Sequence, residues 1–447
     1  MTLAPQRLST AGAGAVRSVK PTRLDLARGD SRVIVAMGPV RVPTVSGLTA
    51  DLLRLGWISA GNRLGIIRVP GSRTWQYDPN HLLHAVLDWH TAFPDTVGLT
   101  IQEKLALLHS SEPTPVGLRI YIADDYLITD IPHGVFDGVM VVQLWLYLTR
   151  YQPDSTPAWA GAPEVTPHMA RSLARHIRSD PRLLLALARA TFSKRRAPST
   201  PDARSPKAED ERPPASPQAS TRCTRSARLR PADLTALRQW RDSNTPGVSV
   251  AVLMMTVLTR AMREVGVELA PHVHVVVDGR RYDPAMRNYL GNAAVGLNLP
   301  FSESYSPKSL QDELTAALTS GRPLAAMLAI SFGQWMSTRR RNTHSQEIDE
   351  PTTAQSATVL SFSHLLGLDD MPDGAWIGGF DAHVFSALTE PADPRGIALL
   401  MPMMRDRYDL SASFDTRYHS IDTVDAALRL ATEHAVPILD AKGTESG

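Results

Sequence analysis

The chain has 447 residues, of which 43% are hydrophobic and 21% charged, and its formal net charge is +2. This is the composition of a globular protein with room for two or three domains, and the charge indicates neither a nucleic-acid partner nor a membrane surface. The single cysteine, Cys223, excludes an intramolecular disulfide and a Cys-rich metal site. With no signal peptide and no apolar run long enough to span a membrane, we expect a cytoplasmic monomer.

The first half of the chain alternates between strand and helix patterns. Residues 1–31 lack apolar periodicity and predict a flexible N-terminal arm. The predicted elements that follow are a strand at 32–37, a helix or a helix and turn at 46–60, an amphipathic helix at 81–93, a β-hairpin at 117–131 that turns at Asp124-Asp125, and helices at 139–149 and 171–194.

The amino-acid composition changes between residues 194 and 230, which are rich in Pro, Ser and Arg and include almost no large apolar residue. Such a stretch buries too little surface to offset the entropy of ordering it, so it predicts a disordered linker. The linker would separate an N-terminal lobe, residues 32–193, from a C-terminal lobe, residues 231–447.

The second half shows the same mixture of patterns. The predicted elements are helices at 231–243, 245–266, 307–321 and 422–439, strands at 271–281, 289–301 and 357–367, a pair of strands at 396–414, and a mobile loop at 338–357. Mixed strands and helices in both halves predict an α/β or α+β fold class.

A compact polar segment, His133-Gly-Val-Phe-Asp137-Gly138, interrupts apolar sequence between a predicted strand and a predicted helix. A histidine with an ordinary pKa near ~6.5 is substantially neutral at cytosolic pH and can act as a general base. A hydrogen bond from its Nδ1 to a backbone carbonyl would hold the required tautomer. Two plainer interpretations stay open: Asp137 caps the helix that follows, and His133 is a satisfied buried histidine.

Three segments together resemble the chloramphenicol-acetyltransferase-like superfamily, which includes CoA-dependent acyltransferases, plant-type BAHD acyltransferases and the condensation domains of nonribosomal peptide synthetases. The first is His133-x-x-x-Asp137-Gly138, which resembles the His-x-x-x-Asp-Gly signature. The second is residues 276–300, in which an arginine precedes a Gly-Asn strand by about ten residues. The third, TVLSFSHLLGLDD at 358–370, resembles the Ser-Asn-x-Gly strand of the stand-alone acyltransferases, with His364 where Asn is usual.

The resemblance implies a two-layer α+β fold of two similar lobes with a tunnel between them and His133 midway along it. His133 would remove a proton from a hydroxyl or amine of a small-molecule acceptor as the acceptor attacks an acyl-CoA or acyl-carrier-protein thioester. No permanently bound cofactor and no metal are implied. The backbone N–H of Gly138 and the hydroxyl of Ser361 or Ser363 would stabilise the oxyanion, although the serines also fit a solvated strand face.

The resemblance also implies residues that support the site. Asp137 would pair with Arg280, or less favourably with Arg281, and so fix the loop. Asn292 would either bridge the lobes or simply end a strand.

One position departs from the family pattern, because Pro132 stands where many relatives have a first histidine. This argues against the peptide-condensation and wax-ester subgroups. The leading interpretation is therefore an acyltransferase. The alternatives are a stand-alone condensation enzyme that depends on a carrier protein, and a catalytically silent member that binds a carrier or a small molecule.

Several other polar residues are assigned plain roles. The histidines at 81, 84 and 90 lie on a predicted helix surface with no supporting metal ligands. His272 and His274 alternate on a strand and are interpreted as structural. Arg339-Arg340-Arg341 fits a solvated loop better than a phosphate site, and Cys223 is rejected as a nucleophile because it lies in the linker.

Overall fold

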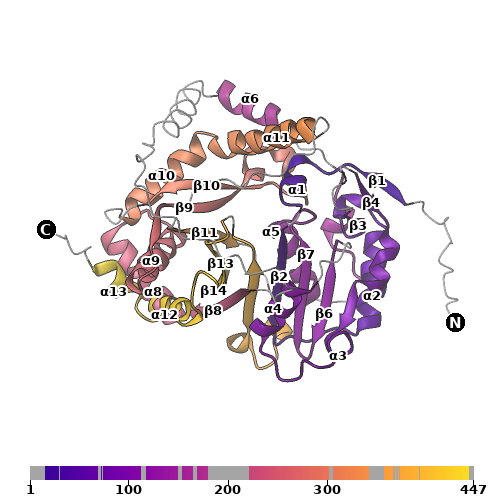
Figure 1. The fold of residues 1–447 in the computed structure, drawn as a ribbon, viewed down its shortest axis with the longest axis horizontal. Helices are drawn as coiled ribbons and strands as arrows, with labels where there is room; N and C mark the ends of the chain where they lie inside the picture. The colour runs from indigo at the N-terminus through magenta and orange to yellow at the C-terminus, as the bar shows by residue number, and fades with distance from the viewer. Residues whose placement is uncertain are drawn as a thin grey trace, which may run out of the picture.

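The computed structural model shows two lobes that lie side by side (Figure 1). It describes residues 16–441 except 30, 69–71, 73, 112–116, 150–153, 165–168, 180–220, 302–305, 342–356, 366–367, 369–370, 372 and 392. None of the helices in these ranges is long and apolar enough to cross a membrane.

The first half of the chain forms mostly short strands and helices. Its elements are β1 (Arg17–Val19), α1 (Arg23–Ala27), β2 (Arg32–Gly38), α2 (Val45–Gly56), β3 (Ile66–Ile67), β4 (Trp75–Tyr77), β5 (Val86–Asp88), α3 (Trp89–Ala92), α4 (Ile101–Ser110), β6 (Arg119–Ala123), β7 (Tyr126–Pro132), α5 (Gly138–Thr149) and α6 (Met169–Ser179).

The second half contributes longer strands and a set of apolar helices. Its elements are β8 (Arg222–Leu229), α8 (Pro231–Asn244), α9 (Val250–Glu264), β9 (Leu269–Asp278), β10 (Ala294–Pro300), α10 (Pro307–Thr319), α11 (Arg322–Arg341), β11 (Thr358–Leu365), β12 (Val384–Thr389), β13 (Ile397–Met404), β14 (Arg407–Asp415), α12 (Ile421–Glu433) and α13 (Ala435–Asp440).

Two sheets organise the lobes. The first has five strands in the order β12-β2-β7-β6-β5, and the second has six in the order β10-β9-β11-β13-β14-β8. A small sheet, β1-β4-β3, lies beside the first. The predicted hairpin at 117–131 is present as the antiparallel pair β6–β7. The fold class predicted from the alternating patterns is therefore confirmed.

The two faces of the six-stranded sheet have different side chains. One face is apolar and packs on α9 and α12 through residues such as Leu360 and Phe362 of β11. Because side chains alternate along a strand, the intervening Ser361 and Ser363 lie on the opposite face, where they line a cavity toward the first lobe. The alternation in TVLSFSHL thus separates core from site.

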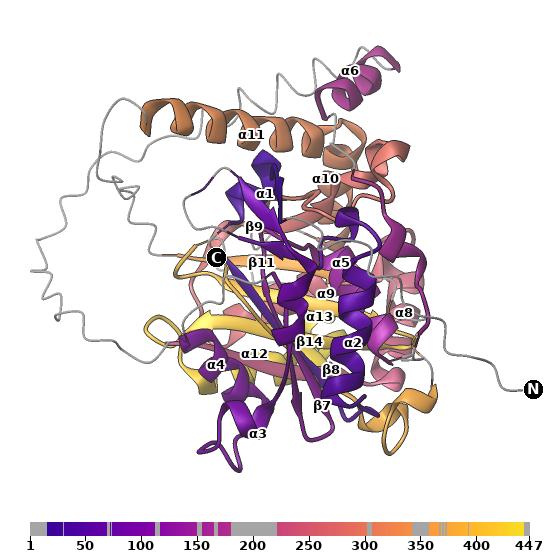
Figure 2. The same ribbon diagram turned by 90° about the vertical axis from the view of Figure 1, so that its right-hand side faces the viewer.

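Segments of the second half of the chain pack into the first lobe, which the predicted domain boundaries did not include. β12, from the second half, pairs antiparallel with β2 in the first lobe's sheet, from Val384 opposite Gly38 to Thr389 opposite Val33. In addition, α11 packs against α1 and α6 of the first half. Figure 2 shows α11 lying across the upper side of the molecule with α6 beside it. Residues 338–341, predicted to be part of a loop, continue this helix, and 342–356 lie outside the described residues.

The predicted N-terminal arm is partly wrong. Residues 17–19 form β1 and residues 23–27 form α1, which begins with a capping box between Thr22 and Asp25. Asp25 is fully buried. The segment is short and polar, so its order comes from contacts with the rest of the chain, which sequence periodicity does not reveal. Residues 1–15 lie outside the described residues.

The predicted linker ends too late. Its residues 222–229 form β8, the edge strand that pairs with β14. The arginines of β8 pair with acidic residues, as in Arg228–Asp409 and Arg225–Asp425, so a polar sequence suits this edge position. Cys223 is therefore in a strand, where burial raises its pKa to about 11, and a thiol of that pKa remains a poor nucleophile at neutral pH. Residues 194–220 lie outside the described residues.

The amphipathic helix predicted at 81–93 is also wrong. The segment consists of a short 3₁₀ turn at Pro79–His84, then β5, then α3. Val86 and Trp89 are buried in different core clusters, on opposite faces of the first lobe's sheet. Val86 and Trp89 are three residues apart, a spacing that is typical of one face of a helix, although here the two side chains lie on different faces of a sheet.

Candidate active site

The loop between β7 and α5 carries the polar segment to the boundary between the lobes. His133 follows directly on β7, and its backbone N–H donates to the carbonyl of Ser31 at 2.8 Å. The following turn is tight, because a side chain at Gly134 would lie 2.8 Å from the carbonyl oxygen of Asp25. α5 then begins at Gly138. The sequence thus places the imidazole on a turn held against the segment that follows α1.

A cavity of about 140 Å³ opens at this imidazole. Both lobes contribute to it: β2, β7, β12 and α5 on one side and β9, β11 and β13 on the other. Its main polar lining residues are Arg28, His133, Asp137, His274, Ser361, Ser363 and Glu390. Gly138 also lines it. The structure therefore brings His133, Asp137, Gly138 and both candidate serines to one cavity, whereas Arg280 and Asn292 lie behind the loop.

The imidazole of His133 is neutral at neutral pH. Burial, and next the positive charge of Arg28, lower its pKa from 6.5 to about 4, although the carbonyls of His133 itself and of Phe136 oppose part of this shift. The Nδ1 atom is buried, and among the described residues it makes no hydrogen bond of normal geometry, so the predicted anchoring has nearby carbonyls but no well-formed hydrogen bond. A reactant in the cavity would reach the other ring nitrogen, Nε2.

Asp137 makes both of the contacts that the sequence left open. Its Oδ1 accepts from the N–H groups of Val139 and Met140, at 3.1 and 3.5 Å, and so caps α5. Its Oδ2 lies 2.7 Å from Nη2 of Arg280. Burial raises the pKa of Asp137 and the guanidinium opposes this, so the charged carboxylate depends on Arg280.

Arg280 is fixed by further contacts from its own lobe. It donates to the carbonyls of Tyr289 and Gly291, at 2.7 and 2.8 Å, and its Nη1 lies 3.1 Å from Asp278. Burial lowers its pKa, but the carboxylates of Asp137 and Asp278 outweigh that effect and the net shift is upward. Arg281, the less favoured partner, is exposed and lies over the ring of Tyr282.

Asn292 spans the two lobes. Its side-chain Nδ2 donates to the carbonyls of His133 and Gly134, at 2.8 and 2.9 Å. Its backbone N–H donates to Oδ1 of Asp25 at 3.1 Å. Of the two roles left open for Asn292, the geometry is that of a bridge, and it holds the backbone on which the imidazole is mounted.

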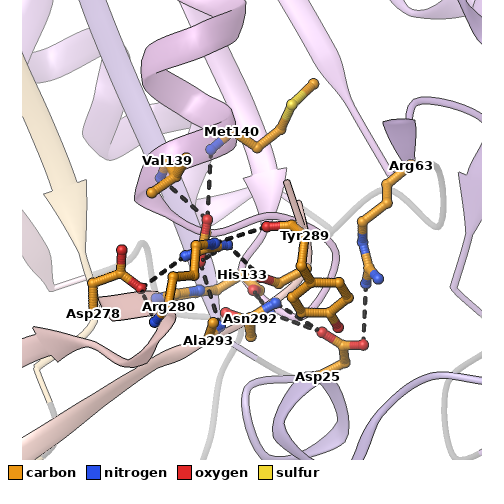
Figure 3. Close-up of polar contacts among 12 residues, drawn as sticks. Asp25, Arg63, His133, Val139, Met140, Asp278, Arg280, Tyr289, Asn292 and Ala293 are labelled. Atoms are coloured by element: carbon orange, nitrogen blue, oxygen red, sulfur yellow. Dashed lines mark hydrogen bonds and ion pairs between the residues drawn. The ribbon is translucent and has the colours of Figure 1, made fainter. Parts of the chain in front are cut away.

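Sequence reasoning missed a second buried ion pair on the other side of the loop. Arg63 lies 3.2 Å from Asp25 and donates to the carbonyl of Val135 at 2.6 Å. Burial lowers the pKa of Arg63, but the carboxylates, chiefly Asp25, outweigh that effect and the net shift is upward. Two arginine–carboxylate pairs therefore bracket the loop (Figure 3). The capping box marks Asp25 only as part of a helix start, and no local motif marks Arg63, so only the long-range contact identifies the pair.

Sequence reasoning also underrated His274, which lines the cavity opposite the first lobe. Its Nδ1 lies 2.8 Å from Oδ1 of Asn298. Gly296, on the neighbouring strand, leaves room for the ring, because a Cβ there would lie 1.6 Å from its Nε2. His364, in contrast, stacks on Tyr408. In the described part of the chain, no three His, Cys, Asp or Glu side chains are grouped to hold a metal ion.

Comparisons with known proteins place this site in a known fold. The sequence matches no family model, and no curated protein resembles it significantly. Solved structures do match over nearly the whole chain. The TRI3 trichothecene 15-O-acetyltransferase from Fusarium sporotrichioides matches with a TM-score of 0.55 at 10% identity, covering 96% of this chain and 97% of that one.

Condensation domains match to a similar degree. The first condensation domain of the calcium-dependent antibiotic synthetase matches with a TM-score of 0.56 at 12% identity, covering 96% of this chain and 98% of that one. The nonribosomal peptide synthetase FmoA3 matches with 0.55 at 14% identity, over 95% of this chain and 43% of that longer one. The chain therefore shares the fold of this acetyltransferase and these condensation domains.

Proposed function

We propose that this protein is an acyltransferase that moves an acyl group from a CoA or carrier-protein thioester to a hydroxyl or amine of a small-molecule acceptor. The observation that carries the proposal is the position of His133, a neutral imidazole that lines a cavity shared by the two lobes. A general base must be unprotonated and within reach of the reacting group.

In the proposed reaction, His133 takes the proton of the acceptor O–H or N–H as the acceptor atom bonds to the thioester carbon. The tetrahedral oxyanion then collapses, the C–S bond breaks, and the imidazolium returns the proton to the departing thiolate. The protein thus begins and ends with a neutral histidine, and no further co-reactant is required.

The start of α5 supplies the best-placed donor for the oxyanion. The first N–H groups of a helix have no partner within it. Asp137 accepts from those of Val139 and Met140, and among the described residues nothing accepts from that of Gly138, which lines the cavity. Ser361 and Ser363 place hydroxyl groups on the opposite wall. We propose Gly138 as the principal donor and Ser363 as a second one.

Asp137, Arg280 and Asn292 are positioning residues in this proposal, because their contacts hold the loop that carries His133. A carrier-dependent condensation reaction is the second candidate, favoured by the condensation-domain match at a TM-score of 0.56. This reaction requires a carrier protein to present the acyl group, and the role of His133 is the same in both reactions.

The test is product formation from a panel of acyl-CoA and acyl-carrier-protein donors with pooled amine and alcohol acceptors, measured by mass spectrometry. We expect acylated product with the natural chain and a loss of about 10²- to 10⁴-fold in His133→Ala. His90→Ala, an exposed histidine of the same lobe, serves as the matched control and should retain activity. Turnover only with acyl-carrier protein would select the condensation reaction, and unchanged turnover in His133→Ala would refute the base assignment.

A further inference from the structure

The cavity contains a positively charged side chain that no acidic group of the described residues neutralises. The guanidinium of Arg28 lines the cavity with His133, and it has no hydrogen-bond or ion-pair partner among the described residues. The other two arginines near the loop differ, because Arg63 is paired with Asp25 and Arg280 with Asp137. Accordingly, burial alone acts on Arg28 and lowers its pKa, whereas carboxylates raise those of the other two.

Arg28 is held in place by its backbone. It is the C-cap residue of α1, and its carbonyl accepts from the N–H and the hydroxyl of Ser31, at 3.2 and 2.9 Å. The carbonyl of Ser31 in turn accepts from the N–H of His133. A short turn therefore fixes the arginine beside the histidine, and the two face one cavity.

Neither acidic residue that lines the cavity pairs with Arg28, and one of them, Asp137, is paired with Arg280. Glu390 lines the same cavity, yet its Oε1 lies 3.6 Å from Nε2 of His109. A partly buried guanidinium without a counter-ion is costly, and a carboxylate ligand would relieve that cost through charge-assisted, bidentate hydrogen bonds. The cavity is otherwise lined mainly by apolar residues of β2, α5 and β13, which strengthen such a contact.

We propose that Arg28 binds a carboxylate of the substrate, so that the acceptor or the transferred acyl group is a carboxylic acid whose acid group enters the cavity of His133. The proposal rests on the acyl transfer described above and narrows its substrate class. Phosphate groups of the donor are a poorer fit, because the whole pantetheine arm separates them from the thioester that must reach His133.

The test compares each acid with a neutral counterpart of the same size. In the acceptor arm these are amino acids and hydroxy acids against their primary amides, and in the donor arm succinyl-CoA against 4-methylpentanoyl-CoA. We expect the natural chain to prefer the acid in one arm by about 10- to 100-fold in kcat/KM, the range for a hydrogen bond to a charged group. The arm that shows the preference identifies the source of the carboxylate.

Three variants assign that preference to Arg28. Arg28→Met should abolish it by lowering kcat/KM for the acid alone, and Arg28→Lys should retain part of it. Arg23→Met is the matched control, because it removes an equal charge from an exposed position on the same helix, and it should leave the preference intact. Equal turnover of acids and neutral counterparts by the natural chain, or equal losses for both in Arg28→Met, would overturn the proposal.

A binding measurement separates this inference from the proposed function. Calorimetry of the full chain with propanoate and with propanamide requires no turnover, and we expect heat only with propanoate and only when Arg28 is present. If propanoate binds in this way while no thioester supports transfer, the anion site stands and the acyltransferase assignment fails. If transfer occurs without acid preference and without propanoate binding, the assignment stands and the anion site is refuted.

Discussion

Asn292 of the second lobe donates its side-chain amide to the backbone carbonyl of His133 in the first lobe, at 2.8 Å. The same amide reaches the carbonyl of Gly134, and the backbone N–H of Asn292 reaches Asp25. The imidazole is therefore mounted on backbone that the opposite lobe holds. A small shift between the lobes would move the proposed base relative to the serines of β11.

Asn292→Ala tests this bridge. The substitution leaves two buried carbonyls without their donor, which should lower the free energy of unfolding by about 1–3 kcal/mol. It should also lower kcat more than it raises KM, because the base is displaced while the cavity remains. Denaturant unfolding and steady-state kinetics measure the two effects. Asn62→Ala is the matched control, because that buried amide likewise donates to two carbonyls, those of Leu55 and Ala160, and none of the three residues lines the cavity. A stability loss with unchanged kcat would limit Asn292 to a structural role.

Arg280→Met tests the buried pair with Asp137. Removing the guanidinium leaves a carboxylate that is 2% exposed without its counter-ion, at a cost of about 3–5 kcal/mol. The double variant Asp137→Asn with Arg280→Met should cost less than Arg280→Met alone, because no uncompensated charge remains. Arg281→Met, at the exposed neighbouring position, should change stability little. A double variant as damaging as the sum of the single ones would show that the pair contributes no coupling energy.

The rate should depend on pH through the imidazole. His133 acts in its neutral form and its pKa is about 4, so kcat/KM should rise as the pH increases through about 4 and then stay level through neutral pH. Arg28, Glu390 and His274 line the same cavity, and Arg28→Met should move this limb to higher pH because the guanidinium lowers the pKa of His133. An acidic limb near 6.5 in the natural chain would contradict the shifted value.

The free energy of unfolding should also depend on pH through His133, and it should fall as the pH is lowered. The pKa of His133 is lower in the folded chain, about 4, than its ordinary value of 6.5, so the unfolded chain binds more protons between these values. The contribution of His133 is complete above about 6.5 and is lost as the pH falls toward about 4. His133→Gln should therefore show a shallower decline in unfolding free energy across this window, measured by denaturant titrations at fixed pH. Identical slopes for the two chains would count against the buried neutral state.

Gly138→Ala tests the space at the start of α5. The added methyl group would lie 2.8 Å from Cδ2 of Leu365, the end of a flexible side chain, so the stability change should stay below about 1 kcal/mol. The backbone N–H is retained, but the methyl group narrows the cavity, so kcat/KM should fall. Adding Leu365→Ala should restore part of it. A fall that Leu365→Ala leaves untouched would argue that the methyl group disturbs the N–H itself.

The site is predictable from sequence where its residues belong to short patterns. His133, Asp137 and Gly138 fall within six residues, and Arg280 precedes Gly291-Asn292 in a second recognisable segment. Their proximity in the fold agrees with the arrangement that the resemblance implies. Arg28, Asp25 and Arg63 are different, because the fold brings them beside the His133 loop from distant parts of the chain. The capping box of Asp25 marks only a helix start and no motif marks the two arginines, so their roles emerge only from the packed structure.

The errors in the fold have a similar origin. The apolar residues at 81–93 have a helix-like spacing, but the segment forms a 3₁₀ turn and a three-residue strand, and Val86 and Trp89 are buried on different faces of the sheet. The segment at 222–229 has the polar composition of a linker, yet β14 supplies its hydrogen bonds and acidic side chains balance its arginines. In both cases a tertiary partner, absent from any local window, decides the conformation.

The pairing of β12 with β2 has a consequence for how the chain folds during its synthesis. From Val33 to Gly38, β2 is paired on one side by β12, whose residues are synthesised some 350 positions later. Until Thr389 has left the exit tunnel, the nascent first lobe presents an unsatisfied, apolar sheet edge to the cell. A gene cut at the linker should therefore yield a first fragment that aggregates, and co-expression of the second fragment should rescue it.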